Sequence, residues 1–320
     1  MRSFLAAFGK TAIFASLVLV LAIPSFAQLS LRKAVDTDGD NRADYTIFRP
    51  SNNNWYTAKS GGGIRQQEFG VYNTDFMVPG DYDGDGKGDI AVWRETDGNW
   101  FALNSGLNTF TVRTWGIPGD EPVARDYDGD GKTDQAVVRR TNGVMIWYIF
   151  SSLTSGYYSR EFGVATDFTA PGDYDGDGRF DYAVQRPGAT PSAAGTFYIQ
   201  TATSYLIYTF GLSSDLVVPG DYDGDGATDI AVVREGATPT SNLTWFVRKS
   251  SNGQLIQRSW GVTGTDLNVQ NDYDGDGKTD FAIWRTTDGK FYIINDVTGA
   301  ISVVSWGAPN DFPVAGYDTH

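Results

Sequence analysis

One acidic segment occurs six times along this 320-residue sequence and sets its period. Five copies read DYDGDG and are followed, after two further residues, by another aspartate and an apolar run. These copies start at Asp81, Asp126, Asp173, Asp221 and Asp272. A degenerate copy, DTDGDNRAD, starts at Asp36. Successive starts lie 45, 45, 47, 48 and 51 residues apart, a period typical of propellers and other repeat arrays.

Four further features recur with the acidic loop. The apolar run after each loop ends in an arginine: Arg49, Arg94, Arg139, Arg186, Arg234 and Arg285. An aromatic pair follows and begins at Trp55, Trp100, Trp147, Phe197, Trp245 and Phe291. An aromatic–glycine step then ends at Gly70, Gly116, Gly163, Gly211, Gly261 and Gly307. The aspartate before the next loop is Asp75, Asp120, Asp167, Asp215, Asp266 or Asp311.

The pattern within a repeat predicts β-strands. In the second repeat, four segments rich in valine, isoleucine and aromatic residues lie at about 76–80, 89–94, 99–104 and 109–115, between glycine-rich turns. The second segment, IAVW, is apolar on both faces, as expected for a sheet covered on both sides. Four-stranded sheets repeated around an axis form a β-propeller, whose closure leaves few exposed edges. We therefore predict an all-β, six-bladed propeller, with a linear β-solenoid as the alternative.

The two ends of the chain suggest how the ring closes. The segment DFPVAGYD at 311–318 resembles the first-strand segments of the other repeats, so we expect it to complete blade one. The segment 29–35 competes for the same position. Residues 1–27 combine two basic residues, an apolar run at 11–23 and a small-residue end, which predicts a secretory signal peptide. A retained N-terminal anchor is the alternative, although the apolar run is short for a membrane span. The remaining residues 28–320 are predicted to form a single propeller domain.

Composition limits the possible partners. The formal charge is −14, or −16 without Arg2 and Lys10, which argues against nucleic acid or an anionic membrane as a partner. The sequence has no cysteine, and its only histidine is His320. An exported chain without disulfides needs another source of stability, and bound metal is one.

The acidic loops are predicted to hold calcium. Carboxylates at positions 1, 3, 5 and 9 of a tight loop converge on one point, and a hard cation with many oxygen ligands offsets their repulsion. The predicted side-chain ligands are Asp36, Asp38, Asp40 and Asp44; Asp81, Asp83, Asp85 and Asp89; Asp126, Asp128, Asp130 and Asp134; Asp173, Asp175, Asp177 and Asp181; Asp221, Asp223, Asp225 and Asp229; and Asp272, Asp274, Asp276 and Asp280. The backbone carbonyl at position 7 should face the same centre, and this residue is Arg42, Lys87, Lys132, Arg179, Ala227 or Lys278. We expect about six structural Ca²⁺ ions, one in each repeat.

Other details of the loop agree with a metal site. Twenty-four of the 34 aspartates fall on these positions, and a plain acidic turn, the alternative reading, needs only one. Gly84 and Gly86 give the loop the backbone freedom for a sharp turn. In the first repeat Asn41 takes the place of the second glycine, and asparagine tolerates positive φ better than most residues. An EF-hand is excluded because position 12 is valine or isoleucine rather than glutamate.

These features resemble the FG-GAP and VCBS-type calcium-loop repeats, which form the blades of integrin-α-like propellers and of many secreted bacterial proteins. The resemblance covers essentially all of residues 28–320, and the loop departs from the pattern only in the first repeat, where Thr37 replaces tyrosine. It implies calcium between the first and second strands of each blade and a role in extracellular binding or adhesion. Seven blades are usual in the integrin version, so seven is the alternative to six.

The arginines, aromatic pairs, aromatic–glycine steps and single aspartates should gather on the face away from calcium. We expect a structural clasp there, in which each arginine stacks on an aromatic ring and pairs with an aspartate, as Arg94 would with Asp120 between Trp100 and Trp115. A ring of glycan or peptide sites is the alternative. The longer connections at 187–196 and 235–244 lie on the same face and are either surface padding or functional loops.

We predict a calcium-binding propeller that acts as an extracellular binding or adhesion module. No catalytic residues are predicted, because histidine- and cysteine-based catalytic groups are absent and four carboxylates around calcium suit a structural site. A carbohydrate-binding lectin using the aromatic and arginine face is the first alternative, and a secreted polysaccharide-degrading enzyme the second. The expected partner is an extracellular protein or glycan. The expected location is outside the cell, at the cell surface or in the periplasm, with the protein as a monomer.

Overall fold

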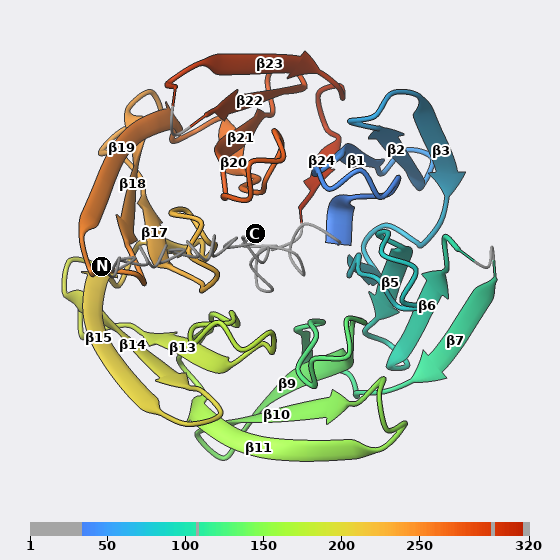
Figure 1. The fold of residues 1–320 in the computed structure, drawn as a ribbon, viewed down its shortest axis with the longest axis horizontal. Helices are drawn as coiled ribbons and strands as arrows, with labels where there is room; N and C mark the ends of the chain where they lie inside the picture. Colours follow the sequence, from blue (N-terminus) through green and yellow to red (C-terminus); the bar gives the residue numbers. More distant parts are fainter. Residues whose placement is uncertain (1–33, 107–108, 296–297, 316–320) are drawn as a thin grey trace, which may run out of the picture.

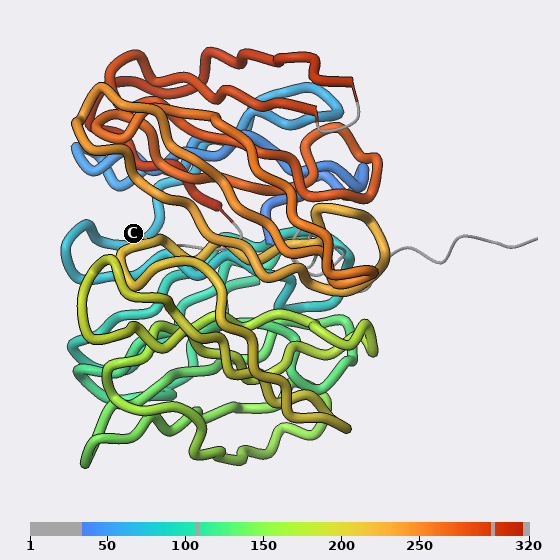
Figure 2. The backbone as a smooth tube through the Cα atoms, turned by 90° about the vertical axis from the view of Figure 1, so that its left-hand side faces the viewer, coloured from blue at the N-terminus to red at the C-terminus, as the bar shows by residue number. Residues whose placement is uncertain are grey.

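The computed structural model describes residues 34–106, 109–295 and 298–315. These residues form six four-stranded antiparallel sheets, arranged as blades around a common axis (Figure 1). The chain runs back and forth between the two faces of the ring (Figure 2). The predicted six-bladed propeller is therefore confirmed, and both the seven-bladed ring and the linear solenoid are wrong. No described helix is long and apolar enough to cross a membrane.

Within each blade, the four strands follow one another from the axis of the ring outward. Blade one consists of β24 (Phe312–Val314), β1 (Tyr45–Arg49), β2 (Asn54–Ala58) and β3 (Ile64–Glu68). Blade two consists of β4 (Asp75–Met77), β5 (Ile90–Arg94), β6 (Asn99–Leu103) and β7 (Phe110–Thr114). Blade three consists of β8 (Glu121–Pro122), β9 (Gln135–Thr141), β10 (Val144–Phe150) and β11 (Tyr157–Val164). Blade four consists of β12 (Phe168–Thr169), β13 (Tyr182–Arg186), β14 (Ala194–Gln200) and β15 (Tyr205–Leu212). Blade five consists of β16 (Leu216–Val217), β17 (Ile230–Arg234), β18 (Asn242–Arg248) and β19 (Leu255–Val262). Blade six consists of β20 (Asp266–Asn268), β21 (Phe281–Arg285), β22 (Lys290–Ile294) and β23 (Ile301–Ser305).

The C-terminal strand closes the ring. β24 pairs antiparallel with β1, with Phe312 opposite Phe48 and Val314 opposite Thr46. The last strand of the chain thus supplies the innermost strand of the first blade, as predicted. Of the competing segment 29–35, residues 29–33 lie outside the described residues, and Ala34 and Val35 are helical. The predicted signal peptide at 1–27 also lies outside the described residues.

The second strand of each blade is buried because neighbouring blades cover both of its faces. In β5, the residues from Ile90 to Trp93 are all buried. One core cluster joins Trp93 of blade two to Val137 of blade three. Another joins Trp284 of blade six to Ile47 of blade one, so the apolar core continues across the closure. This explains why IAVW-type segments are apolar throughout rather than alternating.

Candidate metal sites

In blades two to six the acidic loop joins the first and second strands; in blade one it precedes β1, because the first strand of that blade is β24 from the C-terminal end. In blade two, an isolated bridge between Gly80 and Asp89 brings the two ends of the loop together. The carboxylate of Asp81 accepts hydrogen bonds from the N–H groups of Gly84 at 2.7 Å and Gly86 at 2.9 Å. Both glycines have positive φ, +83° and +85°. The glycines are needed because the chain turns back to direct these N–H groups at the first carboxylate. The equivalent Asn41 of blade one has φ 67°, as its place in the loop predicted.

The aspartate at position 9 ties the end of the loop to its start and to the third strand. Asp89 accepts a hydrogen bond from the N–H of Tyr82 at 2.8 Å and another from the N–H of Ser105 at 2.6 Å. The hydroxyl of Ser105 also reaches the carboxylate of Asp85 at 3.2 Å. Equivalent serine N–H contacts run from Ser60 to Asp44, Ser152 to Asp134 and Ser250 to Asp229. Sequence reasoning missed these serines, although a serine just after the third strand recurs in four repeats.

The loop carboxylates lie close enough to share one cation. Six groups of at least three acidic side chains in the described residues have one oxygen each within 4.8 Å of the others. Five of these groups are Asp36, Asp38 and Asp40; Asp81, Asp83 and Asp85; Asp126, Asp128 and Asp134; Asp173, Asp175 and Asp181; and Asp221, Asp223 and Asp225. All the donors are hard oxygens, which is the ligand type that calcium takes in numbers of six to eight.

Two orphaned oxygens test the fit to a cation. Among the described residues, Oδ1 of Asp38 and Oδ1 of Asp223 are buried and have no hydrogen-bond partner. Both residues occupy position 3 of their loops. A buried carboxylate oxygen without a partner is costly, and a cation bound between the loop carboxylates would provide one. The residues present therefore fit calcium.

Burial makes these carboxylates difficult to ionise without a cation. It raises the pKa of Asp89 to about 6 and that of Asp134 to about 7. For Asp181 and Asp280 burial raises the pKa to about 8, and repulsion from the other loop carboxylates adds to the effect. Without a bound cation, ionisation of these loop carboxylates therefore destabilises the folded protein.

The six loops are joined into a ring by backbone hydrogen bonds. In blade three, the N–H of Thr133 at position 8 donates to the carbonyl oxygen of Asp81, position 1 of the preceding loop, at 2.7 Å. The same contact is made by Gly88 to Asp36, Phe180 to Asp126, Thr228 to Asp173, Thr279 to Asp221 and Ala43 to Asp272. The position-7 side chain also lies against the preceding loop. In blade three this side chain is Lys132, and its Cε is so close to Gly84 of blade two that a Cβ atom added to that glycine would lie only 2.6 Å away. Each candidate site thus contacts its neighbours.

On the opposite face, every repeat forms the predicted clasp. In blade two, Nε and Nη2 of Arg94 bond the two carboxylate oxygens of Asp75 at 2.7 and 2.9 Å. The same guanidinium lies 4.7 Å from the ring centre of Phe101. The other pairs are Arg49–Asp311, Arg139–Asp120, Arg186–Asp167, Arg234–Asp215 and Arg285–Asp266.

The partners within the clasp differ from those predicted. Arg94 pairs with Asp75 rather than Asp120, because Asp75 and Arg94 lie opposite each other in the antiparallel pair β4–β5. The aromatic neighbours also differ, since Trp100 is 1% exposed and its indole N–H donates to the carbonyl of Trp115 at 2.8 Å. The first residue of each aromatic pair belongs to the core, and only the second lies beside the arginine.

The clasp also fixes the aromatic–glycine turn. Oδ2 of Asp75 accepts a hydrogen bond from the N–H of Val71, directly after Gly70, at 2.8 Å. One carboxylate therefore holds the second strand through arginine and the preceding turn through a backbone amide. Such a contact in all six blades agrees with a structural role.

The two longer connections are also fixed by hydrogen bonds. The N–H of Gly188 donates to Oγ of Ser213 at 2.6 Å, and the N–H of Gly236 donates to Oγ1 of Thr263 at 2.8 Å.

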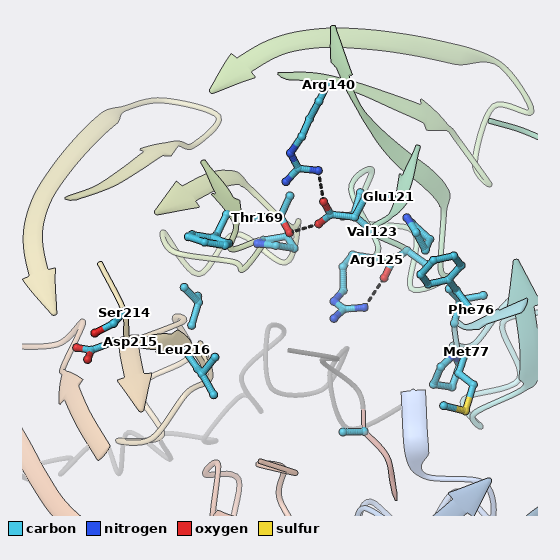
Figure 3. Close-up of a pocket in the computed structure, with 18 of the residues that line it drawn as sticks. Phe76, Met77, Glu121, Val123, Arg125, Arg140, Thr169, Ser214, Asp215 and Leu216 are labelled. Atoms are coloured by element: carbon cyan, nitrogen blue, oxygen red, sulfur yellow. Dashed lines mark hydrogen bonds and ion pairs between the residues drawn. The ribbon is translucent and has the colours of Figure 1, made fainter. Parts of the chain in front are cut away.

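A pocket of about 530 Å³ lies along the innermost strands β4, β8, β12 and β16 (Figure 3). Within it, the guanidinium of Arg140 contacts the carboxylate of Glu121 and donates to the carbonyl of Asp167 at 3.1 Å. The other carboxylate oxygen of Glu121 accepts a 2.6 Å hydrogen bond from the hydroxyl of Thr169. The sequence analysis did not identify Glu121 and Arg140 as candidate site residues. Comparing the residue after the clasp aspartate in the six repeats would have shown that only Glu121 is acidic there.

The fold and loops define a class: a six-bladed β-propeller with an acidic loop in every blade. Residues 81–137, from the loop of blade two into the second strand of blade three, match the FG-GAP-like repeat. The same loop and strand pattern occurs in all six blades, so this match and the six-bladed fold together support a β-propeller of the FG-GAP type. No curated protein matches the sequence.

Solved structures with low sequence identity share the fold. AofleA from Arthrobotrys oligospora is 10% identical, with 90% of each chain covered and a TM-score of 0.50. A mutant of AofleA with three arginine-to-alanine substitutions gives a TM-score of 0.51 at 10% identity, again with 90% of each chain covered. A streptogramin B lyase is 11% identical over 88% of this chain and 87% of the other, with a TM-score of 0.49. At 10% identity the likeness to AofleA concerns the fold alone.

Proposed function

We propose that the protein is an exported, calcium-loaded propeller that binds an extracellular protein or glycan. The clustered loop carboxylates carry the calcium part of the proposal, together with the two buried, unpartnered oxygens of Asp38 and Asp223. The proposed ligands are the aspartates at positions 1, 3, 5 and 9 of each loop. Bound calcium would offset about half of their charge, and the hydrogen bonds between loops would spread that stabilisation around the ring.

The chain's own residues suit a rigid binding scaffold. Six clasps fix one face and the ring of loops fixes the other, so surface groups between them are held in constant positions. Rigid scaffolds of this kind commonly carry recognition groups on their connections and strand ends. Export rests on the basic, apolar and small-residue pattern of residues 1–27.

A glycan is the favoured ligand class among the alternatives. Fully buried tryptophans cannot stack on a sugar, which weakens the proposal of a repeated aromatic binding face. Phe76 and Phe168, however, are 45% and 50% exposed at the central pocket, beside the charged pair of Glu121 and Arg140.

The proposal is tested with the calcium-loaded full chain immobilised on beads. Host or cell-wall extract is passed over it with and without chelator, and total metal is measured by plasma emission. We expect about six calcium ions per chain, and a retained protein or glycan that chelator releases. Absence of bound calcium would overturn the metal assignment, and retention of nothing would overturn the binding role. Turnover of a polysaccharide in the extract would favour an enzyme instead.

A further inference from the structure

We propose that the central pocket, which Phe76 and Phe168 line, binds a neutral hydroxylated ring, such as one sugar unit, through Glu121 and Arg140. This inference rests on the proposed binding function and names the site and ligand class. The pocket lies where the four inner strands approach the axis of the ring (Figure 3). Its volume of about 530 Å³ is in the range of small-molecule sites.

The first argument is that the repeat is broken at this place. Glu121 is the only acid at its position in the inner strands. The residues at the equivalent position of the other blades are Phe76, Phe168, Leu216, Leu267 and Phe312. Arg140 follows the clasp arginine of its blade, where the other repeats have Pro50, Glu95, Pro187, Glu235 and Thr286. Five blades fold with uncharged inner residues, so the scaffold does not require Glu121.

The second argument is the geometry of the two charged side chains. Arg140 pairs with Glu121, and both keep about a third of their side-chain surface exposed, 33% and 35%. Glu121 uses one lone pair of each oxygen for Arg140 and Thr169, so further acceptor sites remain, and the guanidinium has further N–H donors. Donors and acceptors therefore lie side by side with no net charge.

This arrangement selects the ligand class. A hydroxyl group both donates and accepts, so two neighbouring hydroxyls can bond the carboxylate and the guanidinium at once. A ligand with a net charge would be attracted by one member of the pair and repelled by the other, so the pair offers it little net electrostatic gain over a neutral ligand.

The walls of the pocket suit the apolar side of the same ligand. Phe76 is held in place by Trp93, with ring centres 5.7 Å apart, and Phe168 lines the same pocket from blade four. Both rings are about half exposed, which leaves apolar surface uncovered at the centre of the protein. The C–H face of a sugar ring would cover that surface while its hydroxyls reach Glu121 and Arg140.

The test uses the full calcium-loaded chain and a panel of glucose, galactose, mannose, fucose, xylose and N-acetylglucosamine, with glucuronate and glucosamine as charged counterparts. Binding is measured by saturation-transfer NMR and calorimetry. We expect at least one neutral sugar to bind with a Kd of about 1 mM or tighter. Glu121→Leu and Arg140→Thr, which restore residues found in other repeats, should each weaken binding about tenfold or more without lowering Tm.

The matched control is Glu68→Leu, the same change on the exposed strand β3, which should leave sugar binding unchanged. Equal binding by Glu121→Leu, Arg140→Thr and the unmodified chain would overturn the site while leaving the binding function intact. Tighter binding of glucuronate or glucosamine than of any neutral sugar would overturn the ligand class. No binding of the panel to correctly folded, calcium-loaded protein would overturn the inference, and the extract experiment would still decide the broader function.

Discussion

Arg49 forms a two-point ion pair with Asp311, 262 residues later in the chain, with Nε–Oδ1 and Nη2–Oδ2 distances of 2.8 Å. The other five clasps join residues 19 positions apart within one blade. This pair joins β1 to the turn before β24 and thus fastens the closure of the ring. Asp311 has only 2% of its side chain exposed, so the pair is buried on the aspartate side.

Disrupting this pair should weaken closure. We expect Arg49→Ala and Asp311→Ala to couple by about 0.5–3 kcal/mol in a double-mutant cycle, since contacting residues do so and Asp311 is buried. Urea unfolding of the four proteins measures the coupling. As a matched comparison, Arg94 should couple to Asp75, which it contacts, and not to Asp120. Coupling of Arg94 to Asp120 instead would contradict the pairing across β4 and β5.

Removing calcium should destabilise the whole ring. At calcium 100-fold above Kd, each site contributes about 2.7 kcal/mol of free energy of unfolding, and the loops are hydrogen-bonded to one another. We therefore expect metal-free protein to lose at least about 10 °C in Tm, measured by calorimetry. Calcium should restore the value and magnesium should do so poorly. Identical melting curves with and without chelator would reject calcium as a structural ligand.

A single loop variant should remove a single ion. Asp85→Ala takes away the position-5 carboxylate of blade two, so we expect bound calcium to fall by about one ion per chain, because blades contact mainly their neighbours. Asp97→Ala, an exposed aspartate in the β5–β6 turn, is the control and should lose none. Metal analysis showing the same calcium content in both variants would argue against separate sites in each blade.

The metal-free protein should become more stable as pH falls from 8 to 5. Burial raises the pKa of Asp229 to about 7 and that of Asp280 to about 8, from 3.8. A carboxyl with a raised folded-state pKa stabilises the fold while protonated, and this contribution is lost as pH rises through 6–8. Calcium binds the ionised form. The gain in Tm on adding calcium should therefore shrink as pH falls from 8 to 5.

Calorimetry of desalted protein at pH 5, 6.5 and 8, with and without calcium, measures both trends. Desalting avoids the pH dependence of the chelator itself. A Tm of metal-free protein that falls steadily from pH 8 to 5 would show that the loop carboxylates are not the groups that limit its stability.

Features that depend on one repeat could be predicted from the sequence. Each loop, strand and turn has the same local environment in every blade, so its residues recur at a fixed spacing. The six blades, the buried IAVW strand, the positive φ of Asn41 and the C-terminal closing strand all follow from that recurrence. The sequence also named the arginines and aspartates of the clasp.

What the sequence left undecided is which repeated residues meet. Arg94 pairs with Asp75 because the register of β4 and β5 places them opposite each other, and spacing along the chain does not reveal that register. Ser105 reaches Asp89 only because the end of β6 returns to the loop face.

The same limit applies between blades. The hydrogen bond from Thr133 to Asp81 and the contact of Glu121 with Thr169 exist only when successive sheets are packed around a closed ring. Recurrence in the sequence determined the repeated unit. Which of the repeated residues contact one another depends on the angle between packed sheets and on closure of the ring, and these depend on side-chain packing between blades.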